Sequence, residues 1–220
     1  MIKAVIFDLD GVLIDTEYRA IKIKADLCRR YGLEWTADDY YRTAARPFAT
    51  TIGRLFPDKT QEELNGMLAE YRSIAYVDMD YHRLAMPNAG KLLKILHEQG
   101  YRIAIASMSP RRKINQVLSA NHWENYVDLF VASDDVERLK PDPDSYLKTM
   151  NKLGMTSDEC IVIEDSQVGI DAAHGAGCRC ICRREHRYPI EQTGAEYYID
   201  DLLDAAGIIN EMRTELKKNP

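Results

Sequence analysis

Short apolar segments alternate with longer amphipathic segments through most of the chain after residue 84. Residues 3–7, KAVIF, are mostly apolar and end at the charged, glycine-containing turn DLDG, which predicts a short buried strand. Further strands are expected at 102–107, 127–133, 160–165 and 178–182. Helical patterns occupy 89–100, 109–121, 143–154 and 167–177, with a final amphipathic helix near 201–217. Strands that alternate with helices of this length predict βαβ units and an α/β, doubly wound parallel sheet covered on both faces.

Residues 16–82 follow a different pattern. Glycine is sparse there, and apolar residues recur at helical spacing, as at Ala20, Ile23 and Leu27. Thr60 with Glu63 three residues later is a capping-box pattern ahead of a helical segment. The sequence therefore predicts an inserted all-helical domain of about four helices at 16–83, and a core domain formed by 1–15 and 84–220.

Composition narrows the class of protein. A hydrophobic fraction of 45% is ordinary for a globular chain, and a formal charge of −6 argues against a nucleic-acid partner. The opening segment MIKAVIFDLDGVLID is too short and too charged for a signal peptide or a membrane span, and no later apolar run reaches spanning length. Five cysteines without a secretory signal favour reduced thiols. We expect a cytoplasmic protein without a membrane partner.

Three of the cysteines, Cys178, Cys180 and Cys182, share one face of a predicted strand, and His186 follows closely. A soft-metal site is conceivable. Zinc ligands that are close in sequence normally have two or more residues between them, however, and cysteine also serves as a small hydrophobe in a buried strand. The structural interpretation is favoured.

Polar residues follow several of the predicted strands at the ends where they stop. In open parallel sheets, ligands bind outside the carboxyl ends of the strands. Four separate segments should therefore bring their polar residues to one edge: Asp8 with Asp10, Ser107 with Ser109, Lys140, and Glu164 with Asp165.

These residue types suit phosphate chemistry assisted by a metal. Clustered carboxylates favour Mg²⁺, which prefers oxygen ligands, and Lys140 supplies a fixed positive charge. Ser107 and the amides of Met108 and Gly11 can donate hydrogen bonds to phosphate oxygens. Each feature also has a plain structural explanation: aspartates are common in turns, a lone lysine is usually solvated, and serine often caps a helix.

Four motifs resemble the haloacid dehalogenase superfamily: DLDGVLIDT at 8–16, IASMS at 105–109, KPDP at 140–143 and VIEDSQVGIDAAHGAG at 162–177. The helical insert is similar to the cap domain of the beta-phosphoglucomutase and sugar-phosphatase branch, on a Rossmann-like core. The resemblance implies that Asp8 is the nucleophile and forms a phosphoaspartate, and that Asp10 is the general acid and base. It also implies Mg²⁺ bound by Asp8, Asp165, the backbone carbonyl of Asp10 and, mostly through water, Glu164. Ser107 and Lys140 would hold the phosphate.

Within that resemblance, several individual positions distinguish a phosphatase from a mutase. Thr16 matches the hinge residue of the mutases. Position 20 is Ala where mutases carry His, and Pro110 stands near the place of the basic residue of their phosphate loop. The motif that usually begins with Gly reads TAARPF, with Ala45 and Arg46. These departures favour a phosphatase of small phosphorylated metabolites, monomeric, with Arg46 as a specificity contact. A phosphomutase and a non-catalytic regulatory module are the alternatives.

Overall fold

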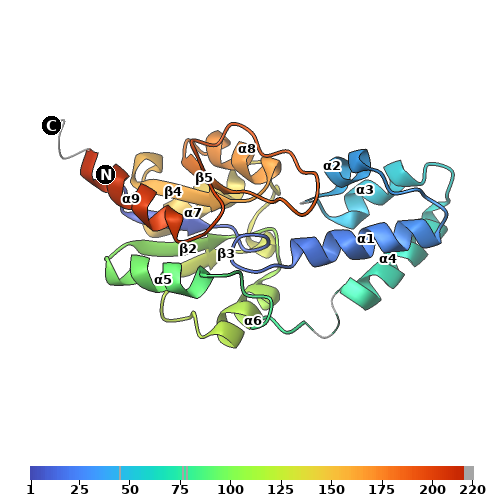
Figure 1. The fold of residues 1–220 in the computed structure, drawn as a ribbon, viewed down its shortest axis with the longest axis horizontal. Helices are drawn as coiled ribbons and strands as arrows, with labels where there is room; N and C mark the ends of the chain where they lie inside the picture. Colours follow the sequence, from blue (N-terminus) through green and yellow to red (C-terminus); the bar gives the residue numbers. More distant parts are fainter. Residues whose placement is uncertain (45, 76, 78, 216–220) are drawn as a thin grey trace. The chain divides into compact units, whose positions relative to one another are not determined.

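The structure is a computed structural model that describes residues 1–44, 46–75, 77 and 79–215. Figure 1 shows its helices and strands along the chain. The strands are β1 (Ala4–Phe7), β2 (Arg102–Ala106), β3 (Leu129–Val131), β4 (Cys160–Glu164), β5 (Arg179–Arg183) and β6 (Tyr197–Ile199). The helices are α1 (Glu17–Arg30), α2 (Ala37–Thr43), α3 (Phe48–Leu55), α4 (Gln61–Ala75), α5 (Ala89–Glu98), α6 (Arg111–Asn121), α7 (Asp144–Leu153), α8 (Gln167–Gly175) and α9 (Asp204–Glu215). Short 3₁₀ turns lie at Ser133–Asp135 and Ser157–Glu159.

The strands form one parallel sheet in the order β3-β2-β1-β4-β5-β6. This confirms the predicted doubly wound α/β fold. The prediction missed the edge strand β6, which has three residues of which only Ile199 is buried. Such a short strand carries too few alternating positions to be read from hydrophobicity alone.

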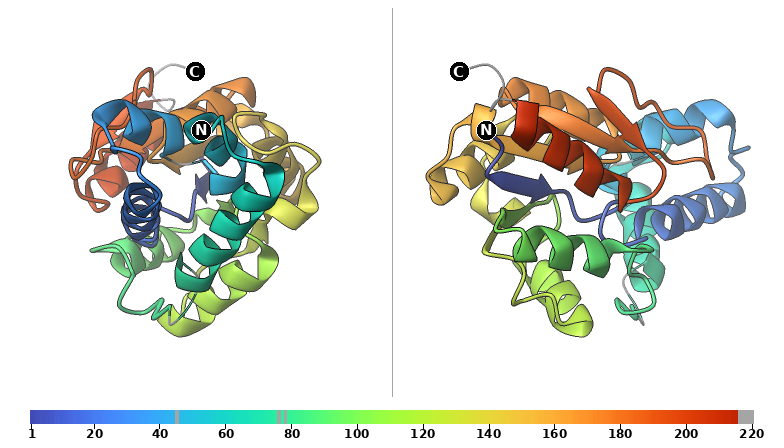
Figure 2. Two further views of the ribbon diagram at one scale, coloured as in Figure 1. Left: turned by 90° about the vertical axis from the view of Figure 1, so that its right-hand side faces the viewer. Right: turned by 60° about the vertical axis from the view of Figure 1, so that its left-hand side comes forward.

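Alternate residues of the strands face two separate layers of the core. In β1, Val5 and Phe7 join the cluster that includes side chains of α5, α6 and α9, whereas Ala4 and Ile6 join the cluster that includes side chains of α7 and α8. Figure 2 shows α9, in red, beside α5, in green. Burial on both faces explains why the central strands are almost continuously apolar.

Internal contacts divide the chain into two compact units. The core unit contains Met1–Asp15, Asp80–Glu185 and the chain from Gln192, and the helical unit contains Thr16–Met79 and His186–Glu191. The helical unit has the four helices α1 to α4, as predicted. The capping box before α4 is confirmed, because the Thr60 amide donates to Glu63 Oε2 at 2.8 Å and the Glu63 amide to Thr60 Oγ1 at 3.3 Å. Assignment of catalytic and cap roles to the two units stays a prediction.

No local pattern predicts that residues 186–191 pack with helices that lie more than 100 positions earlier. Tyr188 is buried in the helical unit, between Tyr18 and Tyr40. The ring centroids are 6.2 and 6.1 Å apart and the ring planes are within 7° and 19° of parallel. Arg187 adds a cation–π contact 4.4 Å from the centroid of Tyr18. The chain therefore passes between the two units four times.

Within the described part of the chain, no helix is both long and apolar enough to span a bilayer.

Candidate active site

The centre of the sheet brings the first and fourth motifs together. Phe7, the last residue of β1, pairs with Ile163 of β4, so the next residues along these strands, Asp8 and Glu164, lie side by side. The chain proceeds from β1 to β2 and β3 on one side and resumes with β4 on the other, so the strand order reverses between β1 and β4. Such a switch point is where ligands bind in open parallel sheets.

Lys140 joins the carboxylates of both strands. Its Nζ donates to Asp8 Oδ1 and to Glu164 Oε1, each at 2.6 Å, and to the carbonyl of Ala106 at the end of β2 at 3.0 Å. The Lys140 side chain is 1% exposed, so this charge is fixed in place and shielded from solvent. The structure thus brings three of the predicted motif segments to one ammonium group.

Tyr146 completes this network and was missed in the sequence. Its hydroxyl accepts from Lys140 Nζ at 2.9 Å and donates to Glu164 Oε1 at 2.7 Å. The KPDP motif lies directly before α7, and Tyr146 is in the first turn of that helix. The only sequence signal was its position, six residues after Lys140. A tyrosine in a helix is more often a core residue, so this position alone does not mark it as functional.

Glu164 is already well satisfied by the protein. Its Oε2 accepts from the amides of Asp165 and Ser166 at 3.0 and 3.3 Å and from Ser166 Oγ at 3.1 Å. Gly169 makes this possible, because a Cβ there would lie 1.9 Å from Glu164 Oε1. Because both of its oxygens accept hydrogen bonds, Glu164 is suited to hold Lys140 in place. It is also better suited to bind a metal through water than directly.

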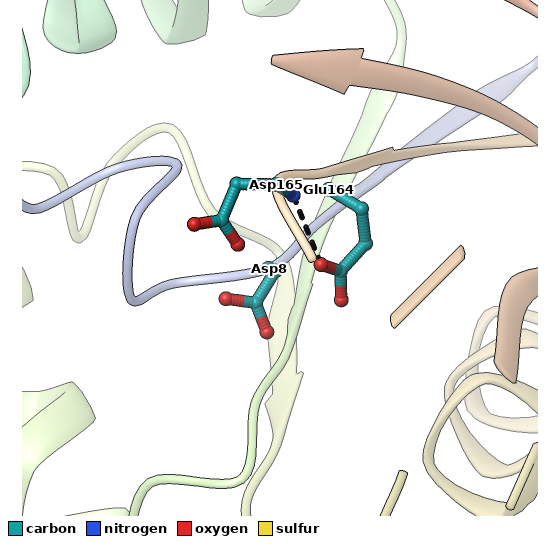
Figure 3. Close-up of side chains that lie close together, drawn as sticks. All are labelled: Asp8, Glu164 and Asp165. Atoms are coloured by element: carbon teal, nitrogen blue, oxygen red, sulfur yellow. Dashed lines mark hydrogen bonds between the residues drawn. The ribbon is translucent and has the colours of Figure 1, made fainter. Parts of the chain in front are cut away.

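Three carboxylates form an acidic cluster, which consists of Asp8, Glu164 and Asp165. One oxygen of each lies within 4.8 Å of the others, and all three residues are buried. Figure 3 shows Asp8 reaching this point from β1 and the other two from the end of β4. Gly11, at φ +91°, leaves room for Asp165, since a Cβ at that position would lie 1.9 Å from Asp165 Oδ2. Hard oxygen donors in this arrangement fit Mg²⁺.

The electrostatics of the cluster follow from its burial. Burial raises the pKa of Asp8 to about 7, opposed by Lys140 and reinforced by the nearby charges of Glu164 and Asp10. Burial alone would lower the pKa of Lys140, but Asp8 and Glu164 raise it above its ordinary value. One lysine therefore stays charged between two carboxylates, and the excess negative charge favours a cation.

Asp10 lies apart from the acidic cluster in its hydrogen bonding. Its Oδ2 accepts from Ser109 Oγ at 2.6 Å, and its Oδ1 pairs with Lys113 of α6. The predicted phosphate donor Ser107 is buried, and its Oγ accepts from the Ser109 amide at 3.0 Å. Met108 lies between these two serines in the β2–α6 connection. Lys113 is a second residue that the sequence did not single out, although Ser109 and Lys113 are four apart.

Arg46 belongs to the helical unit and is exposed. Its backbone carbonyl, with that of Thr43, accepts from the buried Lys24 ammonium at 2.9 and 3.0 Å, and burial lowers the pKa of Lys24. Ala45 lies outside the described residues. The role of Arg46 in specificity stays a prediction.

The cysteine-rich strand has the character of core packing. All five cysteines are free and buried, and Cys178, Cys180 and Cys182 belong to the cluster under α7 and α8. Burial raises the pKa of Cys178 and of Cys182 to about 12. Such thiols stay protonated at neutral pH and behave as small hydrophobes.

Known proteins share both the sequence and the fold. The family described as haloacid dehalogenase-like hydrolase matches residues 5–182. Pyrophosphatase PpaX of Halalkalibacterium halodurans is 30% identical over 217 residues, which cover 94% of this chain and 98% of that protein. The phosphorylated carbohydrates phosphatase of Thermotoga maritima is 29% identical over 179 residues, 80% of this chain and 82% of its own. Another curated relative is much longer, and this chain spans 18% of it.

A crystal structure of a hydrolase from Pseudomonas syringae superimposes with a TM-score of 0.75 at 26% identity, covering 95% of this chain and 98% of that one. The resemblance read from the four motifs is therefore confirmed over most of the chain. With this match and with the motif segments meeting at one edge of the sheet, the chain is an enzyme of the haloacid dehalogenase-like hydrolase family.

Proposed function

We propose that this protein is a Mg²⁺-dependent phosphatase of small phosphorylated metabolites that acts through a phosphoaspartate on Asp8. The observation that carries the proposal is the buried Lys140 ammonium, held 2.6 Å from Asp8 and from Glu164 at the switch point of the sheet. A buried cation beside a carboxylate gives a phosphoryl group charge compensation at the point where the carboxylate would attack.

Asp8 attacks the phosphorus of the substrate, and the bond from phosphorus to the leaving oxygen breaks. Asp10 gives its proton to that oxygen, which leaves as an alcohol. Asp10 then takes a proton from water, whose oxygen attacks the phosphorus and releases Asp8 and inorganic phosphate. Division into two displacements lowers the barrier of each. Lys140, with donors from Ser107 and the amides of Met108 and Gly11, holds the phosphate oxygens through both steps.

Asp8, Asp165 and the carbonyl of Asp10 would hold the Mg²⁺, with Glu164 acting through water. The bound ion would supply positive charge that offsets repulsion between the phosphate and the carboxylates. A cation at this point also favours ionised Asp8, whose pKa is raised in the metal-free protein.

The names of two relatives guide the choice of substrates: one is a pyrophosphatase and one acts on phosphorylated carbohydrates. Pyrophosphate and phosphorylated carbohydrates are both phosphate compounds. We infer that this protein acts on small compounds of this kind and that Arg46 of the helical insert is a specificity contact for them. We infer a monomer in the cytoplasm, acting without nucleic acid or membrane.

The test measures inorganic phosphate released from hexose and pentose phosphates, pyrophosphate and p-nitrophenyl phosphate, each with Mg²⁺ and with EDTA. We expect Mg²⁺-dependent release that falls by at least about 10³-fold in Asp8→Asn. Asp158→Asn is the matched control, because it makes the same carboxyl-to-amide change at an exposed position of the core unit. Turnover that survives in Asp8→Asn would refute the mechanism.

Two alternatives have separate outcomes. A phosphomutase would convert beta-glucose 1-phosphate to glucose 6-phosphate in the presence of a bisphosphate primer, with little free phosphate. A regulatory module would bind phosphorylated compounds without turnover in the unmodified protein.

A further inference from the structure

Asp10 is held by Ser109, in the β2–α6 connection, and by Lys113, in the first turn of α6. Ser109 and Lys113 are four residues apart, and each supplies a donor to a different oxygen of the Asp10 carboxylate. A carboxylate with one fixed donor can still rotate, but one with a donor on each oxygen is fixed in both position and orientation.

Ser109 is itself anchored from both sides. Its amide donates to Ser107 Oγ at 3.0 Å, and its carbonyl accepts from the Ser133 amide at 3.1 Å. Asp10 directly precedes a tight turn in which the Gly11 amide donates to the Ile14 carbonyl at 2.8 Å. The two ends of the contact are thus on rigid backbone.

Three cations, Arg111, Arg112 and Lys113, open α6, and its first turn has no acidic residue. Positive charge is disfavoured there, because the helix dipole places its positive end at the N-terminus. Arg111 is compensated by Asp135, at 2.5 and 2.7 Å. Lys113 is compensated by Asp10, its side chain being 15% exposed and that of Asp10 20%. A cation at this unfavourable end of a helix indicates that Lys113 serves a purpose other than stabilising α6.

Lys113 compensates a carboxylate that carries its charge close to Asp8. The charge of Asp10 is among the causes that raise the pKa of Asp8, so the two carboxylates repel. The ammonium of Lys113 on Oδ1 compensates the charge of Asp10, and together with Ser109 on Oδ2 it limits the positions that the carboxylate can adopt.

We propose that Lys113 is a positioning residue that, with Ser109, holds Asp10 where it can exchange a proton with the leaving oxygen. This rests on the proposed function of Asp10. Its consequence is specific: a substrate whose leaving group needs protonation depends on Lys113, and a substrate with a good leaving group does not.

The test compares aryl phosphates of nearly equal size, from p-nitrophenyl to phenyl and p-methoxyphenyl phosphate. For Lys113→Met, we expect kcat/KM to fall by less than about 3-fold with p-nitrophenyl phosphate and by about 30-fold with the two poorer leaving groups. Lys113→Arg should recover part of the loss. Arg112→Met is the matched control, because it removes the neighbouring exposed cation of the same helix, and should leave the whole series unchanged.

A loss of equal size across the series, carried by KM, would mean that Lys113 binds phosphate directly and would overturn the proposal. No loss in Lys113→Met would overturn it too. Crystal structures of the unmodified protein and of Lys113→Met decide the matter independently of activity. The proposal requires the Asp10 carboxylate to move or adopt several positions, and an unmoved carboxylate refutes it. If no phosphate ester is hydrolysed by the unmodified protein, the proposed function fails while the crystallographic result still tests the positioning.

Discussion

Asp8→Asn should make the metal-free protein more stable at alkaline pH although it removes the nucleophile. The Asp8 side chain is 10% exposed, and burial raises its pKa from 3.8 to about 7. A raised carboxyl pKa means that the folded state prefers the protonated form. The stability gained from that preference is complete below about pH 4 and is lost as the pH rises through about 7.

The size of the effect follows from the two pKa values. The full shift of about three units corresponds to about 4 kcal/mol, of which about 3 kcal/mol falls between about pH 5 and about pH 8. Asn resembles protonated Asp and has no charge to desolvate, so it avoids this cost. For a chain of this size, the advantage of Asp8→Asn should grow by roughly 5–10 °C in Tm over that interval.

Thermal unfolding followed by circular dichroism in EDTA measures this across the pH range, with Asp158→Asn as an exposed control. Mg²⁺ should then raise the Tm of the unmodified protein more than that of the variant, because a bound ion stabilises the ionised carboxylate. A difference between Asp8→Asn and the unmodified protein that does not change with pH would refute the reasoning, as would a variant that is less stable at about pH 8.

Three further changes and one chemical probe test the packing of the site and of other parts of the chain. Gly11→Ala should abolish phosphatase activity, because its Cβ would displace Asp165 and its φ is +91°; a fully active variant would contradict the placement. Gly66→Ala, inside α4 with open space around it, should instead raise the free energy of unfolding by about 0.5–1 kcal/mol in chemical denaturation. Tyr146→Phe should lower it by about 1–3 kcal/mol, because the hydroxyl joins two buried charges; an unchanged value would argue against that network. Cys182, whose pKa burial raises to about 12, should not react with a thiol reagent until the protein unfolds, and rapid reaction in the native state would be inconsistent with its burial.

The residues of this site that can be predicted from the sequence are those with a recognisable local pattern, such as a charged residue at the end of an apolar strand. Asp8 directly follows one apolar strand and Glu164 ends another, and parallel strands place such ends at one edge of the sheet. Lys140 stands out as the charged residue of a distinctive KPDP motif.

The parts that were missed depend on contacts between distant segments. The pairing of Lys113 with Asp10 joins positions 103 residues apart, and helical spacing alone tells only that Lys113 shares a face with Ser109. Tyr146 has an apolar body, so its place in the core conceals the use of its hydroxyl. Strand β6 is too short to show a period, and Tyr188 joins α1 and α2 through ring stacking that no local pattern encodes.

The stacking of Tyr188 has a practical consequence for exchanging parts among relatives of this enzyme. A graft that transfers only residues 16–79 would separate the rings of Tyr18 and Tyr40 from Tyr188, the third member of their stack, which would stay behind in the donor chain. Chimaeras should therefore carry residues 186–191 from the same donor, so that both pieces of the transplanted module arrive with matching surfaces.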